Sequence, residues 1–573
     1  MTLEFKISKL ANYILWIIFI LLVTPTMFIV MNNKYILIDW NLFSIFSTPV
    51  NFSVIMDPIG MVFSCVVILI SANVLEFSKL YMKNDLFINR FTVLVMLFVL
   101  SMNMLIFFPH FMMLLLGWDG LGIVSFILVI YYQNSKSLGA GMITALTNRI
   151  GDVMLLVSIG LTLNQGHWNI MNMWESSMMN IQVILILVAA MTKSAQMPFS
   201  SWLPAAMAAP TPVSALVHSS TLVTAGVFIL IRFFPFLSSM YWFCPLLLLI
   251  AVTTTTMAGI SATTECDMKK IIALSTLSQL GVMMSALGLN MVYLSFFHMI
   301  THAMFKALLF VCAGALIHSF SHSQDLRWMG NSFIQMPTTS SCLMVANLAL
   351  CGFPFISGFY SKDLIIESSM FQSNNFFMVI MIISSVMLTS FYSVRFMVAT
   401  MWSSMNSMPF MVIEETNNLK SPMSILSMMS IISGSLIIWS FPMKQELFIL
   451  STPSKLLSIM MIIMGLWTSW IMSSSSIINK SKFMFNVKIH YASCLMWFLV
   501  PLSSQFMMKP PMKMSLYSLK LIDQSWLEMM GGLGFNKYMN SLSNSSFIFQ
   551  SYSPMNMIFI SMMFMMMIMS LTY

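Results

Sequence analysis

Long uninterrupted runs of apolar residues recur along the whole chain and limit what it can fold into. The runs at 14–30, 91–107 and 555–571 are each about as long as a helix that crosses a bilayer. Only 8% of the residues are Asp, Glu, Lys or Arg, whereas soluble domains carry about 25%. So few charges cannot cover a water-soluble surface. The sequence therefore predicts an all-α membrane protein with about 15–16 transmembrane helices.

Charge and cysteine usage exclude several classes of function. The net charge is +8, but the basic residues are scattered rather than clustered with stacking aromatics, so nucleic acid is not an expected partner. Basic loops beside a lipid bilayer explain the excess more simply. The seven cysteines form no C-x-x-C motif and no repeated short spacing. We therefore expect no iron–sulfur cluster, zinc or other cofactor on this chain.

Two features bear on the origin of the chain. Lys6 and Lys9 precede the first apolar run, as in a secretory signal peptide, but further spans follow, so a retained first helix is expected. The chain holds 65 Met and 47 Phe but only 22 Gly. Folding does not require this bias, because Met and Leu can replace each other in an apolar core at little packing cost. The composition resembles that of AT-rich insect mitochondrial genes.

Pattern changes along the chain predict six segments. Near the end, Leu519, Ile522 and Trp526 recur at helical spacing while Lys520 and Gln524 fall on another face, which predicts an amphipathic helix lying on a surface. The predicted segments are N-terminal transmembrane helices (1–94), a first half (95–235), a second half (236–400), additional transmembrane helices (401–508), the amphipathic lateral helix (509–551) and a terminal transmembrane anchor (552–573).

Two apolar segments are interrupted by proline or glycine beside a lysine. The first contains Lys193 and reaches Pro212; the second begins at Gly352 and reaches Lys362. In transporters, paired interrupted helices mark inverted repeats whose ion sites lie near the middle of the membrane. We therefore interpret 95–235 and 236–400 as two such repeats.

Charged residues inside the apolar segments require an explanation, since one at the centre of a membrane helix costs about 2.5–3.5 kcal/mol on insertion scales. Asp119 lies between glycines in an apolar run, and Lys193 precedes the first interruption. Burial disfavours a charged lysine and a nearby acid favours it, so a lysine between these effects can exchange a proton. A structural acid at Asp119 and a lysine reaching the interface are the alternatives.

Histidines add to this row. His298, His302 and Lys306 are spaced i, i+4, i+8, which places them on one helix face and predicts a proton relay. The histidine pair also has the spacing of a zinc or haem site, although the glutamate of H-E-x-x-H is replaced by Met299. His218 follows the first interruption among hydroxyl residues that could orient water; a buried histidine satisfied by a hydroxyl is the alternative.

The other ionisable residues are more ambiguous. Arg149 and Asp152, spaced i, i+3, support the pathway or form a plain helix-end ion pair. Lys362 and Asp363 place a base beside an acid at the second interruption, where they gate proton access or form an interfacial ion cluster. The remaining groups are expected outside the pathway, as a charged helix start at Glu265, Asp267, Lys269 and Lys270 and a loop at His318, His322, Asp325 and Arg327.

These residues carry a resemblance to a known family. The chain resembles the antiporter-like chain 5 subunits of mitochondrial NADH-ubiquinone oxidoreductase, respiratory complex I, over essentially its whole length and most strongly from 114 to 363. The motifs are Gly117-Trp118-Asp119-Gly120, Asn148-Arg149-Ile150-Gly151-Asp152, Lys193-Ser194-Ala195-Gln196, Pro210-Thr211-Pro212 through His218, Ser275-Thr276-Leu277-Ser278-Gln279-Leu280-Gly281, His298 to Lys306, and Phe359-Tyr360-Ser361-Lys362-Asp363.

The resemblance implies roles for these residues. Asp119 and Lys193 would form the acid–lysine pair of the first half-channel, and Lys362 with Asp363 the exit side. The central hydrophilic axis would consist of His218, His298, His302 and Lys306. Position 119 is Asp where much of the wider family has Glu, which leaves open whether Asp119 contacts Lys193 directly or through water.

The resemblance also implies an assembly and a location. The chain would be a proton-translocating core subunit of an enzyme, NADH:ubiquinone reductase, in the mitochondrial inner membrane. It would perform no redox chemistry itself, because FMN, iron–sulfur clusters and ubiquinone belong to other subunits. Its partners would be lipid, protons and other membrane-arm subunits, including antiporter-like chains contacted by the lateral helix. The alternatives are a free-standing multisubunit-type cation/proton antiporter, a membrane scaffold and a haem-binding electron carrier.

Overall fold

The computed structural model describes residues 4–45, 48–174, 178–372, 375–404, 415, 417–441, 449–473, 487–551 and 554–572. The chain divides into two compact units, Met1–Val500 and Pro501–Tyr573. Each unit is described by itself below. Parts of the predicted segment 401–508 lie outside the described residues.

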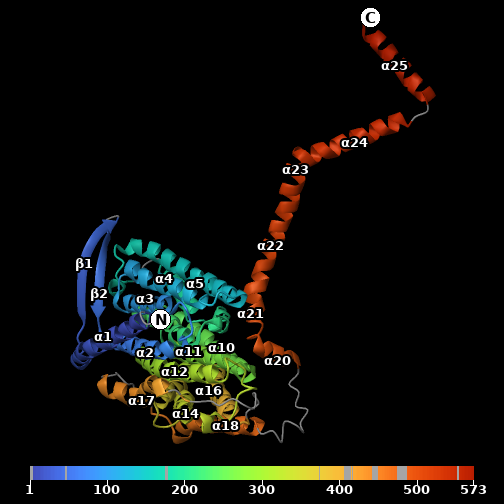
Figure 1. Ribbon diagram of the computed structural model, residues 1–573. Helices are drawn as coiled ribbons and strands as arrows, with labels where there is room; N and C mark the ends of the chain where they lie inside the picture. The colour runs from blue at the N-terminus through green and yellow to red at the C-terminus, as the bar shows by residue number, and fades with distance from the viewer. Residues whose placement is uncertain are drawn as a thin grey trace. The chain divides into compact units, whose positions relative to one another are not determined.

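Helices make up nearly all of the first unit (Figure 1). Its first helices are α1 (Glu4–Asn32), α2 (Pro58–Tyr81), α3 (Ile88–Phe107), α4 (Phe111–Val129), α5 (Ser135–Thr162), α6 (Met179–Lys193), α7 (Trp202–Ala205), α8 (Thr211–Leu216), α9 (Leu222–Leu237) and α10 (Phe243–Thr264). The later ones are α11 (Met268–Gly288), α12 (Val292–Ser319), α13 (Ser332–Gln335), α14 (Pro337–Cys351), α15 (Ser357–Phe371), α16 (Phe376–Met397), α17 (Asn417–Ser440), α18 (Thr452–Ser473) and α20 (Val487–Cys494). α21 (Leu499–Pro501) reaches the boundary between the units, and short 3₁₀ or π turns are η1 (Leu163–Gln165), η2 (Ile170–Asn172), η3 (Ala206–Ala208), η4 (Val217–Thr221) and η5 (Val398–Trp402).

The helices are long enough to cross a bilayer. Thirteen helices among the described residues are long and apolar enough to span it. Two shorter apolar helices, α6 and α14, accompany them. Because an α-helix satisfies the hydrogen bonds of its own backbone, such segments are stable in lipid. The predicted fold class, an all-α polytopic membrane protein, is confirmed, with 13 candidate spans among the described residues where about 15–16 were predicted.

A β-hairpin interrupts the N-terminal segment, where only helices were expected. Strands β1 (Ile36–Ile45) and β2 (Thr48–Met56) pair antiparallel, with an irregularity between Asn41 and Phe43. In β2, apolar Val50, Phe52 and Val54 alternate with polar Asn51 and Ser53, which fits a pleated strand with two different faces. The Phe52 ring lies 4.9 Å from the ring of Phe108, at the end of α3. In Figure 1 the hairpin lies at the margin of the first unit.

An ion pair that the sequence did not reveal links the start of α2 to α9. The Arg232 guanidinium donates to both oxygens of Asp57, at 2.6 and 2.8 Å, and to the carbonyl of Ile106 at 3.2 Å. One Asp57 oxygen also accepts from the Gly60 backbone N–H, which caps α2. A two-pronged Arg–carboxylate contact fixes orientation as well as distance. It therefore holds α2, α3 and α9 in register.

Helix α12 lies at the centre of the first unit. The most apolar part of this helix is entirely buried inside the protein. It packs against α2, α8, α11, α14, α15 and α17, so protein rather than lipid surrounds it. Its polar side chains therefore face the neighbouring helices rather than lipid.

The two interrupted segments expected from the sequence take different forms. After α6 ends at Lys193, the chain forms short irregular pieces and α7 before α8, the π turn η4 and α9 follow in succession. After α14, Gly352 adopts a φ of +84°, a conformation that a residue with a side chain rarely takes, and α15 begins at Ser357. The assignment of two repeated halves stays a prediction.

The second unit is also helical. It contains η6 (Leu502–Phe506), α22 (Met507–Ser518), the π segment η7 (Leu519–Leu527), α23 (Glu528–Met530), α24 (Gly532–Gln550) and α25 (Pro554–Thr572). The large apolar side chains of these helices are exposed in the isolated chain; Trp526 is 71% exposed. Helix α25 is long and apolar enough to span a membrane. The predicted lateral helix thus falls on helical residues with uncovered apolar side chains.

Candidate functional site

Six ionisable side chains from the predicted pathway are fully enclosed in the first unit. All belong to lysine or histidine, and each is at most 2% exposed. They are Lys193, His218, His298, His302, Lys306 and Lys362. Since a charged group away from water costs several kcal/mol unless it is paired, the partners of these groups determine which protonation states they can adopt.

Lys193 belongs to a first cluster of polar groups, made of Trp118, Asp119, Arg149, Asp152 and Lys193. The Lys193 ammonium donates to the Trp118 carbonyl at 2.5 Å and lies 3.7 Å from the centre of the Trp118 ring. The Trp118 indole N–H donates to Asp152 at 2.8 Å. A tryptophan face attracts a cation through its ring quadrupole. Trp118 thus holds the lysine on one side and an acid on the other.

The carboxyl groups of both Asp152 and Asp119 lie near enough to Lys193 to influence its charge. Within the described part of the chain, Asp119 makes no ion pair with Lys193, and its buried Oδ1 has no hydrogen-bond partner. Arg149 lies 3.3 Å from Asp152 and is 59% exposed. This pair lies in the middle of α5 rather than at a helix end. A carboxylate oxygen without a donor is an acceptor position for water.

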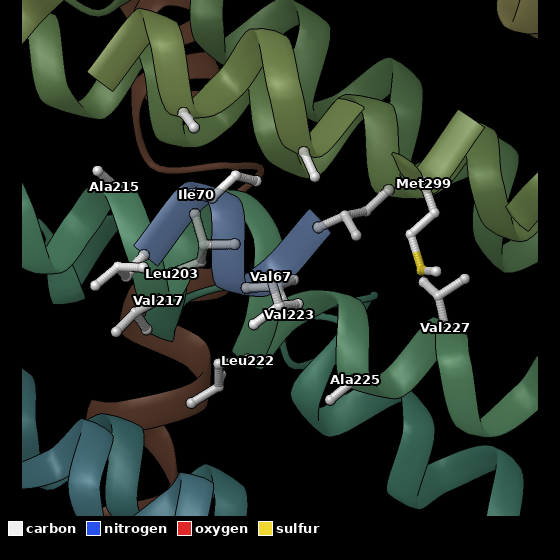
Figure 2. Packing of buried hydrophobic residues seen from close by; sticks show 14 of the residues in the cluster. Val67, Ile70, Leu203, Ala215, Val217, Leu222, Val223, Ala225, Val227 and Met299 are labelled. Carbon is white, nitrogen blue, oxygen red and sulfur yellow. The ribbon is translucent and has the colours of Figure 1, made fainter. Parts of the chain in front are cut away.

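His218 lies in the π turn η4, and its environment is apolar. Neither ring nitrogen has a hydrogen-bond partner in the described structure. Figure 2 shows Val217, which precedes His218 in the sequence, and Leu222 in an apolar cluster that also contains Val67 of α2 and Met299 of α12. The expected hydroxyl partners are not in contact. The connection from the first cluster to the histidines of α12 therefore lacks direct polar contacts at this point.

Trp202 is the residue that brings His218 near the first cluster. Its indole N–H donates to the carbonyl of Thr192, beside Lys193, at 2.9 Å. Its ring centre lies 6.1 Å from the ring centre of His218. The same side chain therefore contacts the end of α6 and the π turn.

A second cluster joins the other two lysines to hydroxyl groups; it consists of Ser275, Gln279, His298, Thr301, Lys306, Ser361, Lys362 and Thr389. The Lys306 ammonium donates to the Ser275 hydroxyl at 2.6 Å. The Lys362 ammonium donates to the Thr389 hydroxyl at 2.8 Å and to the Leu350 carbonyl, at the end of α14, at 3.4 Å. Neither lysine donates to a carboxylate in the described structure.

His298 is the most fully hydrogen-bonded histidine of the row. Its Nδ1 lies 2.9 Å from the Ser361 hydroxyl and its Nε2 lies 3.1 Å from the Gln279 amide oxygen. His302, one turn further along, has no partner at either nitrogen within the described residues, and its ring lies 6.3 Å from that of His298. Because protein groups occupy both nitrogens of His298, a metal or haem bound by this pair would have to displace one of them.

Metal binding lacks ligands elsewhere too. In the described ranges no three His, Cys, Asp or Glu side chains are close enough to hold one ion. This geometry gives the zinc and haem alternatives no support.

Lys362 and Asp363, adjacent in sequence, face different neighbours. Asp363 is only half-buried and interacts with Ser458 of α18, whereas Lys362 contacts α14 and α16. Lys362 therefore belongs with the α12 histidines, and Asp363 lies towards the outside of the first unit.

Several contributing residues carried no assigned role in the sequence analysis. Trp118, Ser275, Gln279, Ser361 and Thr389 supply the oxygens, rings and donors that surround the ionisable groups. Ser275 and Gln279 are spaced i, i+4 on one apolar helix, a signal that could have identified a polar face.

Lys269 lies in the first turn of α11, as the predicted helix start requires, but it is buried rather than solvent-exposed. Lys270 pairs with Asp267 at 2.9 Å as expected there. Lys269 is only 4% exposed, and its ammonium donates to the Ala209 carbonyl at 3.1 Å.

Comparison with known proteins identifies the family. The model "NADH-Ubiquinone oxidoreductase (complex I), chain 5 N-terminus" matches 40–92, "NADH:quinone oxidoreductase/Mrp antiporter, TM" matches 108–389, and "NADH dehydrogenase subunit 5 C-terminus" matches 392–573. NADH-ubiquinone oxidoreductase chain 5 of Lumbricus terrestris is 61% identical over 560 residues, which is 98% of both chains. The chain belongs to the chain 5 family of NADH-ubiquinone oxidoreductase.

Further relatives agree with this assignment. Chain 5 of Anopheles gambiae is 44% identical over 88% of both chains. That of Locusta migratoria is 55% identical over 62% of this chain and 63% of its own. The family resemblance is therefore confirmed. The insect origin stays a prediction, since the annelid relative matches more closely than these two insects.

A solved structure shows the same fold. The structure of an Mrp complex from Dietzia sp. DQ12-45-1b matches with a TM-score of 0.71 at 22% identity, over 85% of this chain and 57% of the other. This chain and the matched chain of the Mrp complex therefore share an antiporter-like fold. The whole-length relatives named chain 5 favour a proton-translocating complex I subunit over a free-standing Mrp-type antiporter.

Proposed function

We propose that this chain moves protons across the mitochondrial inner membrane along its two polar clusters, as a subunit of a complex that oxidises NADH and reduces ubiquinone. The observation that carries the proposal is the environment of the three buried lysines. Each ammonium donates to a neutral oxygen, at 2.5 Å for Lys193, 2.6 Å for Lys306 and 2.8 Å for Lys362. A neutral amine can occupy the same place, so these contacts do not hold the proton on the lysine.

The second cluster also couples its lysines to each other. The charges of Lys306 and Lys362 repel, and repulsion between like charges is strong where water is excluded. A proton arriving at Lys362 therefore favours proton loss from Lys306. The cluster thus passes charge on rather than storing two protons.

The first cluster supplies the acids. Lys193 lies between the influence of Asp152 and Asp119, so a small change in either distance alters its preference for the charged form. We propose that Asp119 and Lys193 start the path, that Arg149 and Asp152 set the local charge, and that His218 connects to His298, His302 and Lys306 through water. Lys362 and Asp363 then lead to the exit.

The energy requirement is modest. Moving one proton against about 100 mV requires about 2.3 kcal/mol, which corresponds to shifts of one or two pKa units distributed over several groups. Redox energy released on other subunits, which carry FMN, iron–sulfur clusters and ubiquinone, supplies it. The helices of 509–551 contact neighbouring antiporter-like chains through their exposed apolar residues, and α25 anchors their far end.

The test is replacement of Lys193 or Lys362 by methionine in the assembled complex, with protons pumped per NADH oxidised as the measurement. We expect both variants to lower this ratio. Lys270→Met, at a surface ion pair with Asp267, serves as the control and keeps it. An undiminished ratio in both lysine variants would overturn the proposal.

Ion flux separates this function from the antiporter alternative. Proton pumping by the intact complex should not require sodium, and the purified chain in vesicles should show no sodium flux. Sodium transport by the chain alone would favour the antiporter.

A further inference from the structure

Gln279 contacts the proton-pathway histidine His298 from a neighbouring helix. It is completely buried in α11. Its amide oxygen lies 3.1 Å from Nε2 of His298, whose other nitrogen, Nδ1, lies 2.9 Å from the Ser361 hydroxyl of α15. Three helices thus determine the hydrogen bonding of one imidazole ring.

The chemistry of the amide oxygen decides which nitrogen carries the proton. An amide oxygen only accepts hydrogen bonds, so Nε2 must be the protonated nitrogen. In the neutral ring, Nδ1 then has a free lone pair and accepts from the Ser361 hydroxyl. The hydrogen bond at one ring nitrogen therefore selects the tautomer at the other.

The far side of Gln279 is compatible with this orientation of the amide. The Gln279 side chain interacts with the Tyr392 hydroxyl of α16, although its Nε2 makes no hydrogen bond of good geometry. Tyr392 is itself within 3.2 Å of the Ser278 hydroxyl. With the amide N–H₂ on the tyrosine side, the oxygen faces His298.

Ser361 has the partners needed to follow protonation of the ring. Its hydroxyl lies 2.9 Å from Nδ1 and 3.5 Å from the Gly358 carbonyl, and the Thr301 hydroxyl is 3.1 Å away. When Nδ1 gains a proton it becomes a donor to the Ser361 oxygen, and the serine hydrogen turns to the carbonyl. The reverse rotation accompanies proton loss, so no other bond changes.

We propose that Gln279 is a positioning residue that holds His298 in the Nε2–H tautomer, so that this histidine exchanges protons only at Nδ1, beside Ser361. The amide oxygen is too weak a base to take the proton from Nε2, so no proton passes through the ring to α11. Protons that reach His298 through water therefore enter and leave the ring at Nδ1, beside Ser361. This inference rests on the proposed function.

The test uses substitutions at Gln279 in the assembled complex, with protons pumped per NADH oxidised as the measurement. Gln279→Met has a similar length but no acceptor, and it should lower the ratio as much as His298→Leu does. Gln279→Glu keeps an acceptor for Nε2–H, but its carboxylate can also take the proton, so this variant should lower the ratio as well. Gln182→Met is the matched control, because Gln182 is also completely buried and lacks partners for its amide.

A double variant separates positioning from packing. If Gln279 acts through His298, adding Gln279→Met to His298→Leu should cause no further loss. A further loss in the double variant would overturn the inference. So would a normal ratio in Gln279→Met while Lys362→Met is impaired. Normal ratios in both Lys193→Met and Lys362→Met would instead overturn the proposed function.

Discussion

The first and second clusters surround their buried lysines with different polar groups. In the first cluster Lys193 lies on a tryptophan ring within the influence of two carboxylates. In the second cluster Lys306 and Lys362 donate to hydroxyls. Carboxylates compensate a buried charge, whereas hydroxyls carry no charge and can accept from either a charged or a neutral amine. The first cluster should therefore depend on its lysine for stability, and the second mainly for proton transfer.

The largest expected effect is on stability in the first cluster. Lys193→Met removes a buried cation that influences Asp152 and Asp119, although Asp152 keeps Arg149 and the Trp118 N–H, and should cost about 2–3 kcal/mol. Lys362→Met removes a charge with no carboxylate hydrogen bond and should change the free energy of unfolding by less than about 1 kcal/mol. Thermal denaturation of the assembled complex and its yield on native gels measure both. Equal losses in the two variants would remove the distinction between the clusters.

The next effect concerns the hydroxyl at Lys362. Thr389→Val leaves the buried ammonium with only the longer Leu350 carbonyl contact and should cost about 1–3 kcal/mol. Thr389→Ser keeps the hydroxyl and should behave like the unmodified protein. Thermal stability and pumping rate are the measurements. If Val and Ser behave alike, the hydroxyl is not what supports Lys362.

A smaller effect is expected from the tryptophan of the first cluster. Trp118→Phe keeps an aromatic face beside Lys193 but removes the N–H that donates to Asp152. Loss of this hydrogen bond should cost about 1–2 kcal/mol. Thermal denaturation checks the value, with Trp202→Phe as a comparison indole whose acceptor is a backbone carbonyl. An unchanged melting temperature in Trp118→Phe would show that Asp152 does not need this donor.

The smallest effect is expected at the edge of the first cluster. Arg149 is 59% exposed, and exposed ion pairs contribute about 0–1 kcal/mol. Arg149→Gln should therefore leave assembly and pumping close to normal, with a difference that falls as salt concentration rises. A large loss of pumping at normal assembly would place Arg149 inside the pathway.

The sequence predicted the membrane fold and the ionisable residues because both depend on local patterns. Charges in apolar runs, an i, i+4, i+8 stripe and proline or glycine beside lysine are all visible in one stretch of chain. The partners of the lysines were not visible. Ser275 and Thr389 resemble many other hydroxyl residues in these helices, and only the packing of α11 and α16 determines which of them meets a lysine.

Other features escaped for related reasons. The hairpin joins two short runs whose apolar content resembled that of a membrane span, and its pairing depends on two strands at once. Asp57 and Arg232 are far apart in the sequence, so neither revealed its partner. Asp152 was considered beside Arg149 because of its spacing, while its contact with Trp118 arises from the packing of α4 against α5.

The burial of α12 has a consequence for how the surrounding lipid can influence this protein. Because neighbouring helices enclose the helix that carries His298, His302 and Lys306, its charges lie in a medium whose polarisability is set by side chains. Changes in acyl-chain length or fluidity reach these groups only by displacing the enclosing helices. The protonation equilibria of His298, His302 and Lys306 should therefore depend little on membrane composition, whereas outer helices such as α1 respond to it directly.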